Sequence, residues 1–284
     1  MFREKTDDVD KIMINKMKLK HCMPVRIVSF PFKNLQFIFR DYLYSKSEDS
    51  KVLKQMRNSK KGERCFIVGN GPSLKVADLD RIKNEFSFGS NRVYELFEKT
   101  KWRPTYYIAT DPNFLDREGD RLPDLTADKI FLNYSHRKKI KNVNKKVLYL
   151  NSRLDYFSLK KYSKRNISIS TDVSHHVSMG YTVTYIAIQL ALYMGFSEII
   201  LIGMDHSYSK IVDSNGVFHY KENVVDHVFD DHSGSYLVFQ YLEGTNFAYS
   251  LANIESQNRG VEILNATRGG KLEIFKRIQF EDLF

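Results

Sequence analysis

Short apolar runs alternate with longer amphipathic stretches from Arg64 to the end of the chain. The predicted strands are 65–68, 86–90, 105–110, 129–132, 146–150, 198–202 and 261–264, and the predicted helices or turns are 74–83, 92–98, 181–195 and 235–257. Gly195 follows the strongest helical pattern, where a glycine commonly ends a helix. Strand–helix alternation of this kind favours an α/β fold with a Rossmann-like, mostly parallel sheet flanked by helices.

The first 63 residues depart from this alternation. Residues 1–23 are polar and rich in lysine and methionine, and we expect this part to be partly disordered. Residues 24–45 carry aromatic and aliphatic side chains near helical spacing, which predicts an amphipathic helix. Such a helix either lies on a membrane surface or packs on its own domain. We therefore expect a basic helical appendage, 1–63, and a catalytic domain, 64–284.

Residues 206–234 form a long polar connection that is rich in histidine and has no clear period. Connections of this length in compact domains are often lids over a site. Asn215-Gly216 marks a turn inside it. A lid would exclude water, which an enzyme with a hydrolysable donor needs.

The net charge of +10 is concentrated at the N-terminus. Residues 1–64 carry 16 Lys/Arg and 8 Asp/Glu, which gives +8, whereas the remaining residues carry 28 and 26, which gives +2. A basic appendage on a near-neutral domain indicates an anionic partner or a membrane surface, unless it is simply solvated. The basic stretch 137–146 lacks interleaved aromatic residues, so we expect no nucleic-acid partner. Two widely separated cysteines favour a cytoplasmic protein, peripheral at most at the inner face of the membrane.

Each predicted strand ends in small or hydrogen-bonding residues. The first is followed by G-N-G-P-S at 69–73, and the other strand ends are Ser90-Asn91-Arg92, Thr110-Asp111, Gly203-Met204-Asp205-His206 and Asn265-Ala266-Thr267. Ligands of open α/β sheets bind beyond the carboxyl ends of the strands. These residues therefore predict a shared polar crevice that holds a nucleotide.

The 69–73 segment is either a tight turn or a phosphate cradle. Gly69 and Gly71 can adopt positive φ and would leave room for a ligand to approach the backbone. Pro72 would stiffen the turn, and Ser73 would cap the next helix, whose N–H groups could hold a phosphate. The Walker spacing is missing, and Leu74 stands where the dinucleotide motif requires its third glycine.

Two families resemble this pattern. The strand with G-N-G-P-S-L, the strand end F-G-S-N-R, the block M-G-F-S-E-I-I-L-I-G-M-D-H-S-Y and the segment D-D-H-S-G-S-Y resemble the bacterial sialyltransferases of glycosyltransferase family 42. The same opening, with W-R-P-T-Y-Y-I-A-T-D and N-A-T-R-G-G-K-L-E-I-F, is similar to the MptE-like superfamily, which is named for an archaeal 6-hydroxymethylpterin diphosphokinase. The resemblance covers about residues 64–280.

The sialyltransferase resemblance implies roles for particular residues. Asn70, Gly71 and Ser73 would hold the phosphate and ribose, and Asn91 the phosphate or the leaving group. Tyr208 would reach the phosphate from the lid. The full expected nucleotide-binding set is Asn70, Gly71, Pro72, Ser73, Asn91, Asp111, Thr182, Gly203, Tyr208, Asn265 and Thr267. The family's Ser-Gly before the G-x-D strand is not matched, and Thr182 or Thr184 replaces it, so the donor sugar stays open.

The expected catalytic set is His232, Asp205 and His206. His232 would be the general base, because a histidine pKa near 6.5 lets it accept a proton from a hydroxyl at neutral pH. His206, together with the other histidines of the 206–234 loop, is a rival for this role. We expect no metal site, since neither zinc spacing nor Asp-x-Asp is present.

The residue pattern alone indicates a nucleotide-binding α/β enzyme, and the sialyltransferase resemblance implies a glycosyltransferase that needs no cofactor. It would move a sugar, such as sialic acid, from a CMP-activated donor to a cell-surface glycan acceptor with inversion, and it could act as a homo-oligomer. One alternative is an MptE-like pyrophosphokinase that uses ATP and Mg²⁺, with Asp111 and Asp205 as metal ligands. Another is a non-catalytic nucleotide-binding protein of a polysaccharide pathway.

Overall fold

The computed structural model describes residues 23–155, 160–222, 224–226, 228 and 239–284. The expected disorder in residues 1–22, the expected base His232 and the predicted helix start at Ser235 lie outside the described residues.

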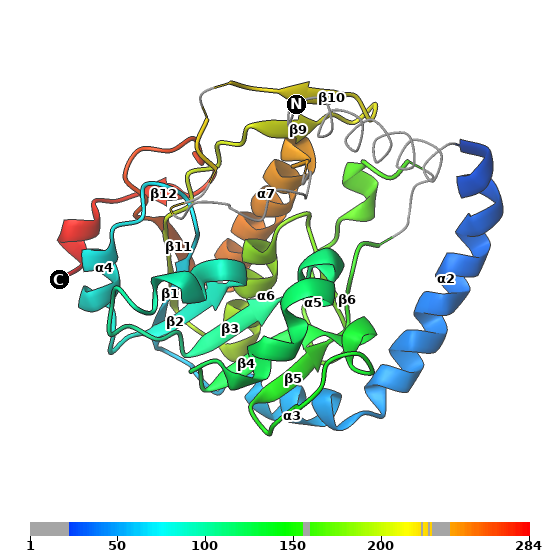
Figure 1. Ribbon diagram of the computed structural model, residues 1–284, viewed down its shortest axis with the longest axis horizontal. Helices are drawn as coiled ribbons and strands as arrows, with labels where there is room; N and C mark the ends of the chain where they lie inside the picture. Colours follow the sequence, from blue (N-terminus) through cyan, green and yellow to red (C-terminus); the bar gives the residue numbers. More distant parts are fainter. Residues whose placement is uncertain (1–22, 156–159, 223, 227, 229–238) are drawn as a thin grey trace, which may run out of the picture.

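A single eight-stranded sheet forms the centre of the protein (Figure 1). Its spatial order is β12-β11-β8-β1-β2-β3-β4-β5, and every pair of neighbours is parallel. The strands are β1 (Arg64–Val68), β2 (Phe86–Ser90), β3 (Tyr106–Ala109), β4 (Lys129–Asn133), β5 (Val147–Leu150), β8 (Glu198–Ile202), β11 (Glu262–Asn265) and β12 (Lys276–Arg277). The sheet confirms the predicted Rossmann-like α/β fold, although the two-residue strand β12 was not predicted.

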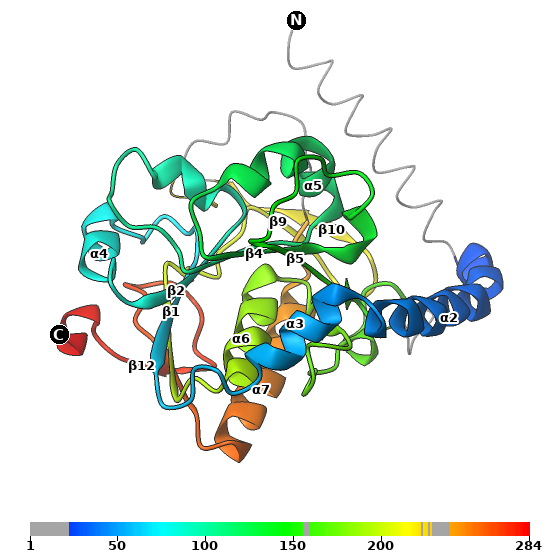
Figure 2. The same ribbon diagram turned by 90° about the horizontal axis from the view of Figure 1, so that it is seen from below.

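Helices cover both faces of the sheet, which is why the central strands are almost wholly apolar (Figure 2). One face carries α4 (Val76–Arg81) and α5 (Pro112–Glu118), and the other carries α3 (Glu48–Met56), α6 (Val183–Met194) and α7 (Leu242–Asn258). Gly195 closes α6 at φ +88°, which confirms the predicted glycine cap. The helix predicted at 92–98 is instead the 3₁₀ helix η1 (Asn91–Leu96).

The strand order reverses between β1 and β8. The chain lays down β1 to β5 in one direction, then crosses the sheet and adds β8, β11 and β12 on the other side of β1. The register pairs Val68 with Ile202, so the segments that follow β1 and β8 begin side by side. Such a reversal point is where open α/β sheets bind ligands.

The predicted N-terminal helix is present as α2 (Met23–Ser45), which projects from the side of the α/β body (Figure 2). Its last turn and α3 join the core: Tyr44 and Leu53 are fully buried, and the Tyr44 hydroxyl donates to Tyr149 O at 2.8 Å. The core therefore includes residues on both sides of position 64. Across the part of the chain that the structure describes, no helix combines the length and apolar composition needed to cross a membrane.

The 206–234 connection contains a hairpin that the sequence did not reveal. Strands β9 (Lys210–Val212) and β10 (Phe218–Tyr220) are antiparallel, and Gly216 at φ +82° lies in the predicted turn. Three-residue strands are too short to show a period of two, which explains the missed prediction. The remaining small elements are β6 (Ser152–Arg153), β7 (Val177–Ser178) and the 3₁₀ helices η2 (Gly119–Asp124), η3 (Tyr134–His136), η4 (Lys164–Asn166) and η5 (Phe280–Leu283).

Candidate functional site

The segments after β1 and β8 are in direct backbone contact. Gly69 N donates to Ile202 O at 2.8 Å, and Gly71 N donates to Gly203 O at 3.0 Å. A Cβ on Gly69 would overlap Gly203 O, and a Cβ on Gly71 would overlap the Asp205 carboxylate. Both glycines are therefore required by contact between the two segments.

This geometry corrects one expectation about the opening motif. Gly69 and Gly71 are absent from the positive-φ residues of the described chain, whereas Gly203 has φ +66°. The space beside Gly69 and Gly71, which was expected to admit a ligand, is occupied by Gly203 and Asp205. Close approach of a neighbouring strand end needs glycine for the same steric reason as close approach of a ligand, and a sequence cannot separate the two.

Asp205 connects three segments of the crevice. Its Oδ2 accepts hydrogen bonds from the Ser73 hydroxyl at 2.7 Å and from Ser73 N at 3.2 Å. Its backbone oxygen accepts from Lys271 N at 2.8 Å. Asp205 thus fixes the turn after β1 and the loop after β11 against the end of β8.

Ser73 was expected to cap α4, but it does not. The N-cap of α4 is Lys75, which makes no side-chain capping bond, and Ser73 binds Asp205 instead. Leu74 N donates to Gly71 O at 3.1 Å. The N–H groups of Gly71, Ser73 and Leu74 therefore donate to acceptors within the protein. Fewer N–H groups are left to bind a phosphate than the expected cradle requires.

Two asparagine side chains lie at the neighbouring ends of β1 and β2. Asn70 Nδ2 donates to Ser90 O at 3.1 Å, which places Asn70 next to Asn91. Both Oδ1 atoms are buried, and neither has a hydrogen-bond partner within the described residues. A buried acceptor without a partner costs about 1–3 kcal/mol. Asn91 also has φ +49°, and its backbone oxygen accepts the Tyr107 hydroxyl. These are the features expected of a site that a ligand completes.

His206 stands directly after Asp205 at φ +52°. Its Nε2 lies 2.6 Å from Asn246 Oδ1, and its ring packs against the rings of Tyr208 and Tyr249, each at 5.8 Å between centroids. Burial lowers the pKa of His206, against the opposing effect of the Asn246 bond. His206 is therefore neutral at pH 7.

Burial also raises the pKa of Tyr208, and the nearby Tyr249, Asp226 and Asp205 add to this effect. The Tyr208 hydroxyl thus stays protonated and available as a hydrogen-bond donor beside Asp205. Asp226 in turn accepts from Ser209 N at 2.7 Å and from the Ser209 hydroxyl at 2.6 Å.

The returning part of the 206–234 connection also reaches the crevice. Val228 N donates to Asn70 O at 2.8 Å. Because Asn70 follows β1, this bond brings the returning part of the connection to the strand ends. The bond and the Ser209–Asp226 pair hold the segment at both sides of the hairpin.

Four other expected nucleotide contacts have partners inside the protein. Asp111 is the N-cap of α5 and accepts Phe114 N at 2.9 Å, and Thr182 is the N-cap of α6. Asn265 Oδ1 accepts Thr267 N at 3.1 Å, and Thr267 Oγ1 accepts Met204 N at 3.0 Å. Asn265 and Thr267 therefore shape the loop that supports Asp205.

Asn246, Asp226 and Lys271 complete the site but were missed from the sequence. Asn246 lies on α7 and orients His206, Asp226 fixes Ser209, and Lys271 N binds the Asp205 backbone. No local pattern marks any of them, since each acts through a residue distant in sequence. Within the described residues, no three side chains of His, Cys, Asp or Glu gather closely enough to hold a metal ion.

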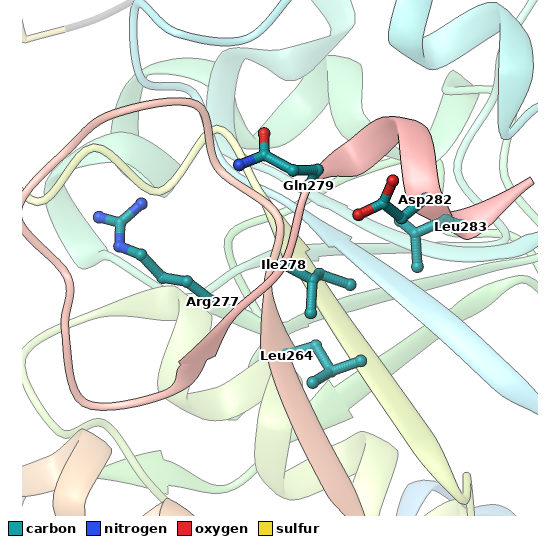
Figure 3. Close-up of a pocket in the computed structure, with 6 residues that line it drawn as sticks. All are labelled: Leu264, Arg277, Ile278, Gln279, Asp282 and Leu283. Carbon is teal, nitrogen blue, oxygen red and sulfur yellow. The ribbon is translucent and has the colours of Figure 1, made fainter.

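A separate pocket of about 490 Å³ lies at the β11–β12 edge (Figure 3). Its lining residues are Leu264, Arg277, Ile278, Gln279, Asp282 and Leu283, none of which belongs to the expected site. Arg277 connects the two regions, because its Nη1 donates to Thr267 O at 3.1 Å and its Nη2 to Gly270 O at 3.2 Å.

Residues 41–211 match the family model described as 6-hydroxymethylpterin diphosphokinase MptE-like, which confirms that resemblance. A search of curated proteins found no match. Among solved structures, the Maf glycosyltransferase from Magnetospirillum magneticum AMB-1 is similar, with 15% identity and a TM-score of 0.50 over 84% of this chain and 39% of that one. This likeness shows a shared fold, and the chain spans well under half the length of that protein.

A mammalian sialyltransferase, solved in complex with Gal-beta-1-3GalNAc-ortho-nitrophenol, has 13% identity and a TM-score of 0.35 over 84% of this chain and 86% of that one.

Proposed function

Since the chain belongs to the 6-hydroxymethylpterin diphosphokinase MptE-like family, we propose that its strand-end crevice binds a nucleotide and that the protein is a glycosyltransferase with a CMP-activated sugar donor. The proposal rests on the pair of buried Oδ1 atoms of Asn70 and Asn91, which lie beyond the ends of β1 and β2, next to the reversal point of the sheet. The fold shared with the Maf glycosyltransferase supports it.

The chemistry of these two oxygens defines what the ligand must offer. An amide oxygen only accepts hydrogen bonds, so each needs an N–H or O–H donor. Ribose hydroxyls and the amino group of cytosine are such donors, whereas phosphate oxygens at neutral pH are acceptors. We therefore assign Asn70 Oδ1 and Asn91 Oδ1 to the nucleoside, and a donor such as the Tyr208 hydroxyl to the phosphate.

His206 has the chemistry of a general base in this site. Asn246 Oδ1 can only accept, so Nε2 of His206 carries the proton and Nδ1 of the neutral ring holds the free electron pair. Nδ1 would take the proton of an acceptor hydroxyl as its oxygen attacks the anomeric carbon. The bond from that carbon to the phosphate breaks with inversion, and CMP leaves with the electron pair. His232 remains the second candidate for this role.

The expected independence from metal is part of the same proposal. A monophosphate leaving group carries less charge than a diphosphate, and hydrogen-bond donors such as Tyr208 would stabilise it. The nucleotide-sugar donor and a glycan acceptor are then the substrates.

The name of the family favours a second candidate, a pyrophosphokinase that transfers diphosphate from ATP to a pterin-like alcohol. Asp205 and Asp111 would be its Mg²⁺ ligands. Asp205 already accepts two hydrogen bonds from Ser73, and Asp111 caps α5, so both would have to bind the ion while keeping these partners.

A thermal-shift panel separates these functions. CMP, CMP-sialic acid, UDP, GDP and ATP are each tested with Mg²⁺ and with EDTA. A ligand at about 100 times its Kd stabilises the native state by about 2.7 kcal/mol. We expect CMP compounds to raise the melting temperature in EDTA. A shift with ATP that requires Mg²⁺ would establish the second candidate instead, and no shift with any nucleotide would contradict both.

Asn91→Gly tests directly whether the buried Asn91 Oδ1 binds the nucleotide. Glycine accepts φ +49° without strain, so the substitution removes the amide and leaves the backbone. We expect the CMP-induced shift to fall by at least half, while the melting temperature without ligand changes little. Asn142→Gly is the matched control, since Asn142 has φ +53° in an exposed loop and should leave the shift unchanged.

A further inference from the structure

Helix α2 has one face fastened to the α/β body. Phe37, Asp41 and Tyr44 lie on this face at helical spacing. Asp41 Oδ2 pairs with Arg153 Nη2 at 3.1 Å, and its Oδ1 accepts Asn151 Nδ2 at 2.6 Å. The Arg153 guanidinium lies 4.8 Å from the Phe37 ring centroid. These contacts fix which face of α2 looks outward.

The outward face of α2 is apolar. It consists of Phe32, Leu35, Ile38, Phe39, Tyr42 and Leu43, which are exposed by 65%, 64%, 68%, 64%, 61% and 41%. At 100° per residue these side chains cover an arc of about 140°, opposite the fastened face. We call this set the α2 apolar face. Single exposed apolar residues are ordinary, but a contiguous group of this kind marks an interaction site.

Exposed basic residues follow the α2 apolar face at its C-terminal end. Lys46 follows the helix, with its Nζ 5.8 Å from the Tyr42 ring, and Lys51 and Lys54 are exposed on α3. Between residues 31 and 63 the chain carries eight Lys/Arg and four Asp/Glu, a net charge of +4. The acids are partly engaged, because Asp41 binds Arg153 and Glu48 binds Lys51 at 2.5 Å.

A second basic segment starts beside the C-terminal end of α2. The Tyr134 ring packs edge-on against Tyr44 at 4.9 Å, and the Arg137 guanidinium lies 3.9 Å from the Tyr134 centroid. The exposed loop that follows contains Lys138, Lys139, Lys141, Lys145 and Lys146. Lys139 is paired with Asp116 at 2.7 Å, so the other exposed lysines of this loop add positive charge to the segment that starts beside Tyr44.

From this combination we propose that the α2 apolar face binds the surface of an anionic lipid bilayer, with the neighbouring lysines contacting lipid headgroups. Helices with an apolar face and basic flanks lie in the membrane interface, and each nearby cation adds to the attraction of anionic lipid. The apolar arc covers less than half of the helix, which suits a helix that lies along the surface.

The charge distribution favours a lipid surface over a second copy of the chain. A symmetric dimer through α2 would also cover the apolar face. Such a dimer would, however, bring the lysines at the end of α2 and on α3 of one copy toward positively charged residues of the other copy. An anionic bilayer covers the apolar face and neutralises the lysines at the same time.

Vesicle co-sedimentation with the full chain tests this proposal. One set of vesicles is pure phosphatidylcholine, and the other contains about 30% phosphatidylglycerol, at about 0.1 M and about 0.5 M salt. We expect binding to the anionic vesicles at low salt, with at least a tenfold loss of affinity at high salt. We expect the same loss for the double variant Ile38→Ser/Phe39→Ser, whose side chains are exposed and whose melting temperature should be unchanged.

The matched control is Val217→Ser/Val225→Ser, which removes two other exposed apolar side chains, 52% and 65% exposed. It should bind anionic vesicles as the unchanged protein does. The proposal would be overturned if the protein did not bind the anionic vesicles, or if Ile38→Ser/Phe39→Ser bound them as well as Val217→Ser/Val225→Ser does. So would light scattering that shows a dimer which Ile38→Ser/Phe39→Ser dissolves, because the face would then join two copies.

Discussion

Replacing Gly71 by alanine tests the contact between the two segments that form the crevice. The new Cβ would overlap Asp205 Oδ2 and lie 2.7 Å from Gly203 O, whereas real Cβ atoms almost never approach other atoms within 3.0 Å. The Asp205 side chain can rotate away, but the Gly203 carbonyl belongs to the backbone after β8. Accommodation therefore breaks the two Ser73–Asp205 bonds and moves the ends of β1 and β8 apart.

Three contributions set the loss in the free energy of unfolding of Gly71→Ala. Forcing a methyl group into a filled space costs about 1–3 kcal/mol. Losing a hydrogen bond to a charged acceptor costs about 1.5–3 kcal/mol. Alanine recovers about 0.4–1 kcal/mol through the unfolded state, since φ of Gly71 is not positive. When the two bonds between Ser73 and Asp205 are counted as one interaction, the net loss is about 1.5–5.5 kcal/mol in the free energy of unfolding, or about 3–20 °C in melting temperature.

Denaturant unfolding of Gly71→Ala, Asp205→Ala and the double variant measures this loss and its origin. Asp205→Ala removes the carboxylate that the Cβ overlaps, so the double variant should be less destabilised than the sum of the single variants by about 1–2 kcal/mol. Gly119→Ala is the control, because its Cβ would meet only the Ile140 side chain, at 3.1 Å. A loss below about 1 kcal/mol for Gly71→Ala, or strict additivity, would refute the reasoning.

Three further predictions concern the packing of the fold and the titration of His206. Ser87→Ala removes the acceptor of the fully buried Trp102 Nε1–H, at 3.1 Å, and should cost about 1–3 kcal/mol in denaturant unfolding; an unchanged midpoint would contradict it. His206 has a folded pKa below its usual value of 6.5. The neutral side chain therefore makes its full contribution to the free energy of unfolding above that pH, and this contribution is lost as the pH falls through the folded pKa. Thermal melts across this range should show a steeper loss toward acid pH for the unchanged protein than for His206→Gln, and parallel curves would disprove the effect. Gly195→Ala, at φ +88°, should lower the free energy of unfolding by about 1–2 kcal/mol, which circular dichroism melts can check against the unchanged protein.

The hydrophobic pattern determined the elements of the sheet because its causes are local. Four- and five-residue apolar runs between polar segments favour strands that are buried on both faces, because such runs are too short for helices, and β1 and β8 occur where such runs were found. Gly195 was identifiable as a helix end because the left-handed conformation excludes most side chains. Polar residues at strand ends likewise indicated a crevice before any strand order was known.

Only the tertiary structure decided which of those polar residues face the crevice with unsatisfied groups. The reversal of strand order places β8 beside β1, so Asp205 meets Ser73 from 132 positions away in the sequence. The same packing turns Thr267 toward the Met204 backbone and leaves the oxygens of Asn70 and Asn91 without partners in the described residues. A sequence shows where side chains that can form hydrogen bonds lie along the chain, but strand pairing determines which partners they reach, and that pairing depends on packing across the whole sheet.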